Sequence, residues 1–235
     1  MTIKLVTFDL DDTLWDNLPI ISEAEADMVQ WLQERVPGFQ DWYRQFGSST
    51  RSQILEERPQ IRYDLNKVRI AVLERILTNG TVEPVAAHEL AVSALGIFHG
   101  RRNRFLLFDG AEEVLATLGQ KYVLASITNG TSDVNKSPLG KYFDISISAA
   151  HVLASKPNPS MFMVVLSQSG ALPKEAVHVG DHPVDDIECA NSVGMHTIQL
   201  QIQDRGRKRE VSQLATRVVE HLGQVPSVVE ELNDV

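Results

Sequence analysis

The sequence predicts an α/β fold: a Rossmann-like, doubly wound parallel sheet with an all-helical domain inserted near its start. Three observations lead to this prediction. Short apolar runs alternate with helical patterns, most of these runs show no polar/apolar alternation, and residues 16–100 contain no convincing strand. Nearly continuous apolar strands are typical of a parallel sheet covered on both faces. Strands that alternate with helices favour the doubly wound arrangement.

The predicted strands are the short apolar runs themselves. Five clear strands and a weaker sixth are expected at residues 3–8, 122–127, 143–148, 176–180, 196–200 and 217–222. Helices are expected at 109–119, 158–170 and 185–194. Asp109 and Glu112 have the spacing of a capping box at the start of the first helix. Gly170 predicts the end of the second helix.

The segment after the first strand has a different pattern. Apolar residues recur at helical spacing in four stretches, 20–32, 39–46, 65–76 and 90–98. Each stretch predicts an amphipathic helix. We therefore expect a core domain formed by residues 1–15 and 101–235, and a helical domain formed by residues 16–100.

Composition narrows the classes of partner and compartment. Lys and Arg number 22 against 31 Asp and Glu, a formal charge of −9, which disfavours nucleic acid as a partner. Cys189 is the single cysteine, so no intramolecular disulfide can form. No run of 18 apolar residues occurs, so we expect a cytoplasmic protein without membrane contact. A monomer and a homodimer both remain open.

Polar side chains follow four of the core segments. The groups are Asp9, Asp11 and Thr13; Thr128, Asn129 and Gly130; Lys156; and Asp181, Asp185 and Asp186. Ligands of an open parallel sheet bind at the carboxyl ends of its strands, so we expect these groups to meet there. Asp9 and Asp181, with a backbone carbonyl and waters, would form an all-oxygen site that suits Mg²⁺. Without a cation, the crowding should raise the pKa of at least one carboxylate.

Four short motifs carry a resemblance to a known family. The sequences DLDDT (9–13), SITNG (126–130), SKPNP (155–159) and GDHPVDD (180–186) resemble, in order and spacing, the four motifs of the haloacid dehalogenase-like hydrolase superfamily. The helical insertion resembles the cap domain of that superfamily's first subclass. TFDLDDTLWDN and LASITNGTSDV are similar to bacterial phosphatases of the superfamily that act on FMN or on 5-amino-6-(5-phospho-D-ribitylamino)uracil.

The resemblance implies roles for the motif residues. Asp9 would be the nucleophile that forms an aspartyl phosphate, and Asp11 the general acid. Thr128 would bind phosphoryl oxygens, and Lys156 would offset the negative charge. Asp9, the Asp11 carbonyl and Asp181 would bind Mg²⁺.

The roles of several neighbouring residues are less closely defined by the motifs. Asp186 fits the later acidic position better than Asp185, as a residue that supports the metal ligands. Asn129 and Gly130 would contact the phosphoryl group. Trp15 would touch a substrate ring, or would instead pack between the two domains. His182 would bond near the metal or face solvent.

The function expected from this resemblance is a Mg²⁺-dependent phosphatase. Its substrate would be a small phosphorylated metabolite: FMN, a riboflavin-pathway phosphate, a nucleotide or a sugar phosphate. A 2-haloacid dehalogenase is a competing expectation, but it needs neither Mg²⁺ nor an acid two residues after the nucleophile, so Asp11 speaks against it. A phosphomutase of the same superfamily and a non-catalytic binding module also stay open.

Overall fold

The structure is a computed structural model that describes residues 2–202 and 210–233. The chain forms two compact units. The core unit comprises Met1–Asp16 and Leu106–Val235, and the helical unit comprises Asn17–Phe105.

The core unit contains a six-stranded sheet in which every neighbouring pair is parallel. The strands are β1 (Leu5–Phe8), β2 (Val123–Thr128), β3 (Ile145–Ser148), β4 (Ala176–Gly180), β5 (His196–Leu200) and β6 (Arg217–Val219). Their order is β3-β2-β1-β4-β5-β6, so the strand order reverses at β1. This arrangement confirms the predicted doubly wound parallel sheet, including its weak sixth strand. A reversal point of this kind is where ligands bind in open α/β sheets.

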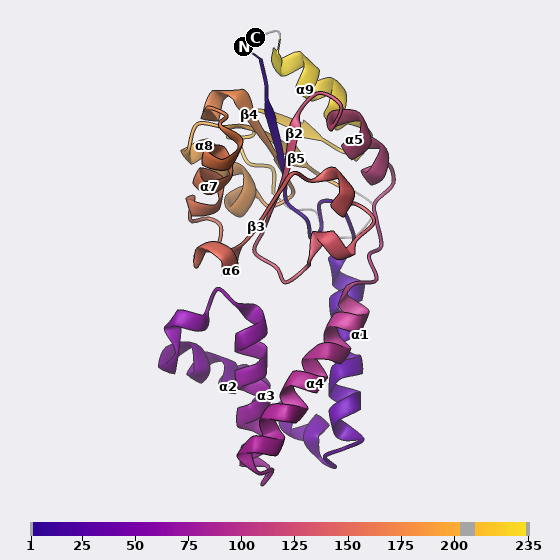
Figure 1. Cartoon of the computed structure of the whole chain (residues 1–235), viewed down its shortest axis with the longest axis vertical. Helices are drawn as coiled ribbons and strands as arrows, with labels where there is room; N and C mark the ends of the chain where they lie inside the picture. Colours follow the sequence, from indigo (N-terminus) through magenta and orange to yellow (C-terminus); the bar gives the residue numbers. More distant parts are fainter. Residues whose placement is uncertain (1, 203–209, 234–235) are drawn as a thin grey trace. The chain divides into compact units, whose positions relative to one another are not determined.

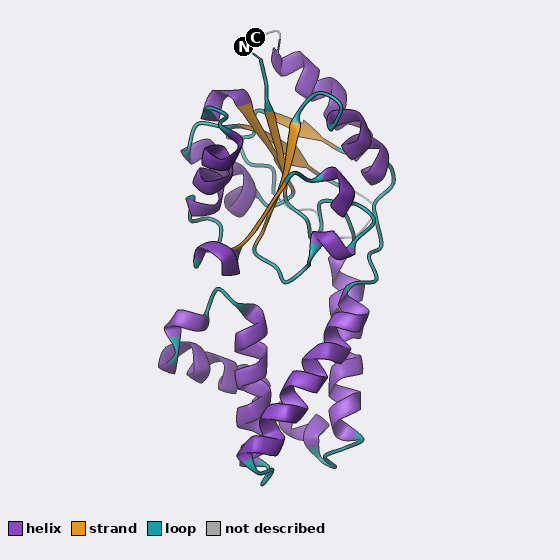
Figure 2. Ribbon diagram, viewed as in Figure 1, coloured by secondary structure: helices purple, strands orange, loops and turns teal. Residues whose placement is uncertain are grey.

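Helices cover both faces of this sheet (Figures 1 and 2). The helices α5 (Ala111–Leu118) and α9 (Val225–Asn233) lie on one face, and α7 (Ser160–Ser169) and α8 (Cys189–Ser192) lie on the other. A short helix, α6 (Ala149–Val152), follows β3. Every residue of β1 and β4 is buried, which explains why their sequences lack polar/apolar alternation.

The start of α5 differs from the sequence-based expectation. The helix begins at Ala111, and its N-cap is Gly110, which has a φ of 78° and makes no side-chain capping bond. The predicted capping box of Asp109 and Glu112 is therefore wrong. Glycine adopts this left-handed conformation at little cost, so the chain turns into the helix one residue later than Asp109. The predicted end of α7 is confirmed, because Gly170 caps it with a φ of 69°.

The region expected as one short helix at 185–194 is divided. A π-helical segment, η5 (Pro183–Glu188), is followed directly by α8. His182 is the N-cap of η5, and its Nδ1 atom accepts a hydrogen bond from the backbone N–H of Asp185 at 3.0 Å. This cap sets the direction in which the chain leaves β4.

The helical unit consists of four main helices around a core of its own. They are α1 (Asn17–Gln33), α2 (Phe39–Glu57), α3 (Leu65–Asn79) and α4 (Pro84–Arg102). Met28, Phe39, Leu73 and Phe98, one from each helix, are fully buried in this core. The unit ends at Phe105 rather than at residue 100, because α4 continues through Arg102. Among the described residues, no helix combines the length and the apolar composition that a membrane span requires.

Candidate active site

An acidic hollow lies where the central strands of the core sheet end. In the register of the sheet, Phe8 at the end of β1 pairs with Ser126 of β2 and with Val179 of β4. The residues that follow these strands are thus brought together. The hollow has a volume of about 170 Å³ and is lined by Asp9, Asp11, Asp12, Thr128, Asn129, Gly130, Lys156, Asp181, His182, Asp185 and Asp186. The structure therefore brings together the strand-end groups that the sequence singled out.

Lys156 lies at the centre of this cluster, and its ammonium group is fully hydrogen-bonded. Its Nζ atom donates to Asp9 Oδ1 at 2.6 Å, to Asp186 Oδ1 at 2.6 Å and to the Ile127 carbonyl at 3.1 Å. An ammonium group has three N–H donors, so these three acceptors fix its position. Burial alone would lower the pKa of Lys156, but the charges of Asp186 and Asp9 outweigh burial and raise it. Lys156 is therefore a permanent cation in the cluster.

The two carboxylates bound to Lys156 have opposite pKa shifts. Burial raises the pKa of Asp9 well above its usual range; Lys156 lowers it, whereas Asp186 and Asp181 raise it further. The same burial acts on Asp186, but Lys156 and a hydrogen bond from His178 overcome it and lower its pKa. The expectation of a raised carboxylate pKa is confirmed. Burial is its largest cause, ahead of the crowding of like charges.

The arrangement fits a divalent cation. Asp9, Asp181 and Asp186 each offer a carboxylate oxygen, and these oxygens lie within 4.8 Å of one another. The three buried carboxylates face one ammonium group, so the cluster has an excess of negative charge that a cation would balance. The Thr13 hydroxyl lies 3.4 Å from Asp9 Oδ2 and 3.4 Å from Asp181 Oδ1, so these two oxygens flank one point. Hard carboxylate oxygens are the ligands that Mg²⁺ prefers.

Asp11 is held by side chains from two loops. Its Oδ1 atom accepts hydrogen bonds from Trp15 Nε1 at 2.7 Å and from Ser132 Oγ at 2.9 Å. Its Oδ2 atom lies against Gly130: a Cβ atom at that position would come within 2.4 Å of it. A side chain at residue 130 would therefore have to displace the Asp11 carboxylate.

The turn of the DLDDT loop depends on Asp12. This residue has a φ of 64°, in the left-handed region, and its backbone N–H donates to the Trp15 carbonyl at 2.9 Å. Aspartate tolerates this conformation better than most residues. The turn brings the Trp15 indole, which is fully buried, back toward Asp11. Contact between Trp15 and a substrate ring stays a prediction.

Thr128 and Asn129 shape the neighbouring loop. Thr128 Oγ1 accepts a hydrogen bond from the Gly130 N–H at 2.9 Å. Asn129 bonds twice to the backbone of Lys156: its Oδ1 accepts from the Lys156 N–H at 2.8 Å, and its Nδ2 donates to the Lys156 carbonyl at 3.0 Å. The amide of Asn129 thereby fixes the loop that carries Lys156. Binding of a phosphoryl group by Thr128, Asn129 and Gly130 stays a prediction.

The two adjacent aspartates of η5 lie in different surroundings. Asp186 is buried, and its Oδ2 accepts the His182 N–H at 2.9 Å. It packs so close to Gly180 that a Cβ atom there would lie 2.4 Å from Asp186 Cγ. Asp185 is partly exposed and is 3.5 Å from Asn129 Nδ2. Of the two, Asp186 is the carboxylate that holds Lys156.

Three residues of this network carry no site prediction from the sequence. Ser132 bonds directly to Asp11, and His178 bonds to Asp186 at 3.4 Å. Gln199 of β5 donates to the Asp181 carbonyl at 3.2 Å. One usable signal exists for His178 and Gln199, since each is a polar residue inside a run that otherwise has the pattern of a buried strand.

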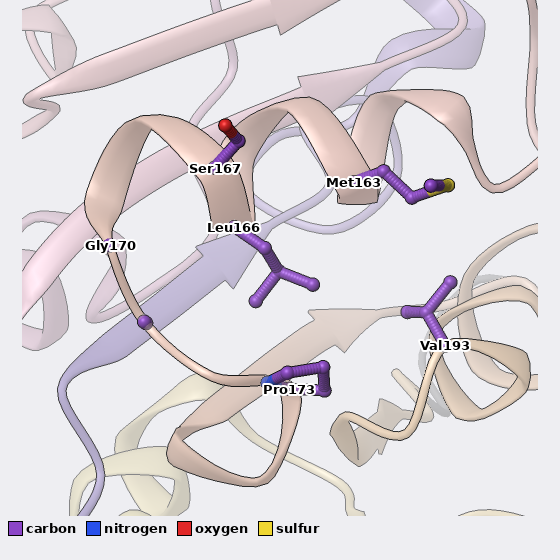
Figure 3. A pocket seen from close by; sticks show the side chains of 7 residues that line it. Met163, Leu166, Ser167, Gly170, Pro173 and Val193 are labelled. Carbon is purple, nitrogen blue, oxygen red and sulfur yellow. The ribbon is translucent and has the colours of Figure 1, made fainter.

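A second hollow of the core unit has a different character (Figure 3). It has a volume of about 540 Å³ and is lined by Met163, Leu166, Ser167, Gly170, Ala171, Pro173 and Val193. Ser167 supplies the one polar side chain of this lining. No lining residue could balance the charge of a phosphoryl group, so the acidic hollow is the candidate active site.

Comparisons with known proteins identify relatives of this chain. The family model for haloacid dehalogenase-like hydrolases matches residues 3–194. The chain is 28% identical over 193 residues to 5-amino-6-(5-phospho-D-ribitylamino)uracil phosphatase YigB of Escherichia coli, covering 82% of this chain and 81% of that protein. It is 27% identical to phosphoserine phosphatase of Thermus thermophilus over 88% of this chain and 91% of that one.

A solved structure is also similar along almost the full length. The crystal structure of a 2-haloacid dehalogenase from Pseudomonas syringae pv. tomato matches with a TM-score of 0.89 and 33% identity, covering 98% of this chain and 99% of that chain. The family model, the phosphatase relatives and this structure agree on one assignment. The chain belongs to the haloacid dehalogenase-like hydrolase family.

Proposed function

We propose that the protein is a Mg²⁺-dependent phosphatase that hydrolyses a small phosphomonoester through an aspartyl-phosphate intermediate. The observation that carries this proposal is the buried Asp9–Lys156–Asp186 bridge beside Asp181 and Asp11. These side chains line one small hollow, which supports the roles that we assign to Asp9 as nucleophile, Lys156 as fixed cation and Asp11 as acid.

In the first step of the proposed reaction, Asp9 is the nucleophile. A carboxylate oxygen of Asp9 attacks phosphorus, and the bond from phosphorus to the leaving oxygen breaks. Lys156 Nζ, 2.6 Å from Asp9 Oδ1, remains beside the carboxylate and stabilises the negative charge on the transferring group. Asp9, the Asp11 carbonyl and Asp181 would hold Mg²⁺, which would supply charge neutralisation at the phosphoryl oxygens and keep Asp9 ionised.

Asp11 supplies the proton in this scheme. Its Oδ1 atom accepts hydrogen bonds from Trp15 and Ser132, which hold the carboxyl group in place for proton transfer. Asp11 donates this proton to the leaving oxygen. It then takes a proton from the water that attacks the aspartyl phosphate, which releases inorganic phosphate and restores Asp9.

The proposed substrate class follows from the relatives and from the size of the hollow. A hollow of about 170 Å³ holds a phosphoryl group but is smaller than typical pockets for whole small-molecule ligands, which are roughly 300–1,000 Å³. The organic part of the substrate therefore extends beyond the acidic hollow. YigB and phosphoserine phosphatase, by their names, act on small phosphorylated metabolites. We include FMN, nucleotides and sugar phosphates in the proposed range.

A second candidate function is 2-haloacid dehalogenation. The Pseudomonas syringae structure, at 33% identity, favours it. Against it stand the acidic side chain of Asp11, held in place by two hydrogen bonds, and the excess of carboxylates. A dehalogenase needs a nucleophile but no proton donor for a leaving halide.

One experiment separates the two candidates. The purified protein is incubated with a panel of phosphomonoesters and, separately, with 2-chloropropionate, each with Mg²⁺ or with EDTA. Our proposal expects Mg²⁺-dependent release of inorganic phosphate and no release of chloride. Chloride release that persists in EDTA, without phosphate release, would establish the dehalogenase instead.

A further inference from the structure

His178 is a fully buried polar residue that the proposed reaction does not use. It lies in the middle of β4, directly opposite Thr7 of β1 in the register of the sheet. Its Nδ1 atom lies 2.7 Å from Thr7 Oγ1, and its Nε2 atom lies 3.4 Å from Asp186 Oδ1. Its ring and the ring of Phe162 lie edge to face, with centroids 4.8 Å apart. Two polar residues thus face each other inside otherwise apolar strands.

The partners of His178 determine its tautomer. Asp186 is ionised, because Lys156 and His178 lower its pKa, so its oxygens can only accept hydrogen bonds. Nε2 must therefore carry the proton that is directed at Asp186. Nδ1 then has a lone pair and accepts from the Thr7 hydroxyl, whose other acceptor, the Val177 carbonyl, is farther away at 3.4 Å. Thr7 holds the tautomer that gives Asp186 a donor.

The ring supplies this donor without adding a charge. Burial lowers the pKa of His178, and Asp186 only partly opposes that effect. A neutral imidazole is present at neutral pH, so it does not compete with the Lys156 ammonium for the negative charge of Asp186.

Asp186 is in turn saturated by its donors. Its Oδ1 atom accepts from Lys156 Nζ and His178 Nε2, and its Oδ2 atom accepts the His182 N–H. Lys156 uses its remaining donors on Asp9 and on the Ile127 carbonyl. The chain of contacts from Thr7 through His178, Asp186 and Lys156 to Asp9 is continuous.

We propose that His178 is a positioning residue: its Nε2–H holds the Asp186 carboxylate in the orientation that keeps the Lys156 ammonium on Asp9. An apolar side chain of similar size could fill the space beside Phe162. It would leave Asp186 Oδ1 without its neutral donor, and only Lys156 and the His182 N–H would then restrain the carboxylate. A role in packing alone predicts a loss of stability; a positioning role predicts a loss of turnover in a folded protein.

The inference rests on the proposed phosphatase function, and its test compares four variants in the full-length protein. His178→Leu removes the donor, His178→Gln keeps an N–H donor, and Thr7→Val removes the hydroxyl that sets the tautomer. His196→Leu is the control, since His196 begins the neighbouring strand β5, where it is partly buried and pairs with Val177 rather than with a residue of the acidic hollow. For each variant, kcat and KM are measured with p-nitrophenyl phosphate and Mg²⁺, together with Tm.

The expected result is a loss that appears in kcat. His178→Leu should lower kcat by about tenfold, the effect of removing a hydrogen bond to a charged group, with KM changed less than about twofold. His178→Gln should recover part of the loss, Thr7→Val should show a smaller loss, and His196→Leu should match the wild type. A folded His178→Leu variant with unchanged kcat would overturn the inference, as would a His178→Gln variant no more active than His178→Leu, or a loss of kcat that follows Tm alone. Should His178→Leu fail to fold, an unchanged kcat in Thr7→Val would overturn the inference.

Crystal structures test the role of His178 independently of the proposed phosphatase activity. If the wild type hydrolyses no phosphomonoester, the proposed function fails, and the positions of the side chains still test His178. Crystal structures of the wild type and of His178→Leu, or of Thr7→Val should the Leu variant fail to fold, should show a longer Lys156–Asp9 contact in the variant. An unchanged contact would overturn the inference whatever the activity.

Discussion

Asp9 is the residue on which the opposing electrostatic effects of the site act together: burial, like charges and the Lys156 ammonium group. It is buried with two further carboxylates, and a single ammonium group, that of Lys156, balances them. Burial raises its pKa, so the folded protein without a cation binds a proton at Asp9 more readily than the unfolded chain does. A nucleophile must be ionised, which means that the same side chain links metal binding, folding stability and reactivity.

Replacing Asp9 with Asn tests this link. Asn keeps an oxygen that can accept from Lys156 but cannot attack phosphorus, so we expect turnover to fall on the order of 10³-fold or more. Because the substitution removes a buried like charge, we expect Tm without Mg²⁺ to rise, and the increase in Tm on adding Mg²⁺ to shrink. Activity assays and thermal unfolding with and without the metal measure both effects. Normal turnover in Asp9→Asn would exclude the nucleophile assignment.

Gly130 is a second residue whose replacement has a defined outcome. A Cβ atom at this position would lie 2.4 Å from Asp11 Oδ2, so Gly130→Ala must displace the carboxylate that we assign as the acid. We expect kcat to fall by about 10²-fold, the lower end of what general acid catalysis contributes. Gly96→Ala is the control, because nothing lies within 4 Å of the added atom there. If kcat of Gly130→Ala equals that of the control, the assignment of Asp11 is wrong.

At the scale of residues, the sequence predicts the groups that end strands and misses those that support them. Asp9 and Asp181 directly follow β1 and β4, so the parallel sheet alone brings them together. Ser132 reaches Asp11 only through the path of the loop after β2. No local pattern encodes that path, so no sequence rule could have paired Ser132 with Asp11.

At the scale of elements, helix ends show how local competition decides a boundary. Asp109 and Gly110 both precede α5, and the left-handed glycine turn prevails over the capping box. In α3, by contrast, Asp64 is the N-cap, and its carboxylate accepts from the Lys67 N–H at 3.1 Å. Both sequences offer an aspartate before an apolar helix, so the outcome depends on the turn that leads into each helix.

Asp64→Ala measures the contribution of this cap to the helical unit. Loss of the capping bond should lower the free energy of unfolding by about 1 kcal/mol. Asp64→Asn is the matched control, since asparagine caps helices as well as aspartate does. Chemical denaturation of both variants gives the difference. Equal destabilisation by Ala and Asn would assign the effect to the exposed ion pair with Lys67 instead.

At the scale of the whole molecule, the buried network makes stability depend on pH. The folded-state pKa of His178 lies below its usual value of 6.5. As pH falls below about 6.5, the unfolded chain takes up a proton that the folded protein does not bind, so stability decreases. Asp186, whose pKa is also lowered, adds a further loss at more acidic pH, whereas Asp9, whose pKa is raised, opposes these losses because the folded protein binds its proton more readily.

The predicted pH dependence can be assigned to one residue. Between pH 7 and about pH 5, the free energy of unfolding should fall less steeply in His178→Gln than in the wild type, because the titrating ring is gone. Denaturant unfolding at several pH values measures both slopes. Identical slopes would show that His178 is not the source.

The overall architecture could be predicted because its signals are repeated along the chain. Six apolar runs, each followed by a helical segment or a loop, leave little choice but a parallel sheet, and the order of β1 to β6 follows from winding outward on each side of β1. The π-helical start of η5 could not be predicted. It depends on the His182 cap and on the contact of Asp186 with Gly180, which join residues only after the fold has formed.

The central claim is that Asp9 accepts the phosphoryl group in a Mg²⁺-dependent reaction. The most direct measurement is mass spectrometry of the protein after acid quenching during turnover of a phosphomonoester, with peptide mapping of the modified residue. We expect one phosphoryl group on the peptide that contains Asp9 when Mg²⁺ is present, and none in EDTA or in Asp9→Asn. Steady release of phosphate with no modified peptide, or with the phosphoryl group on another residue, would contradict it.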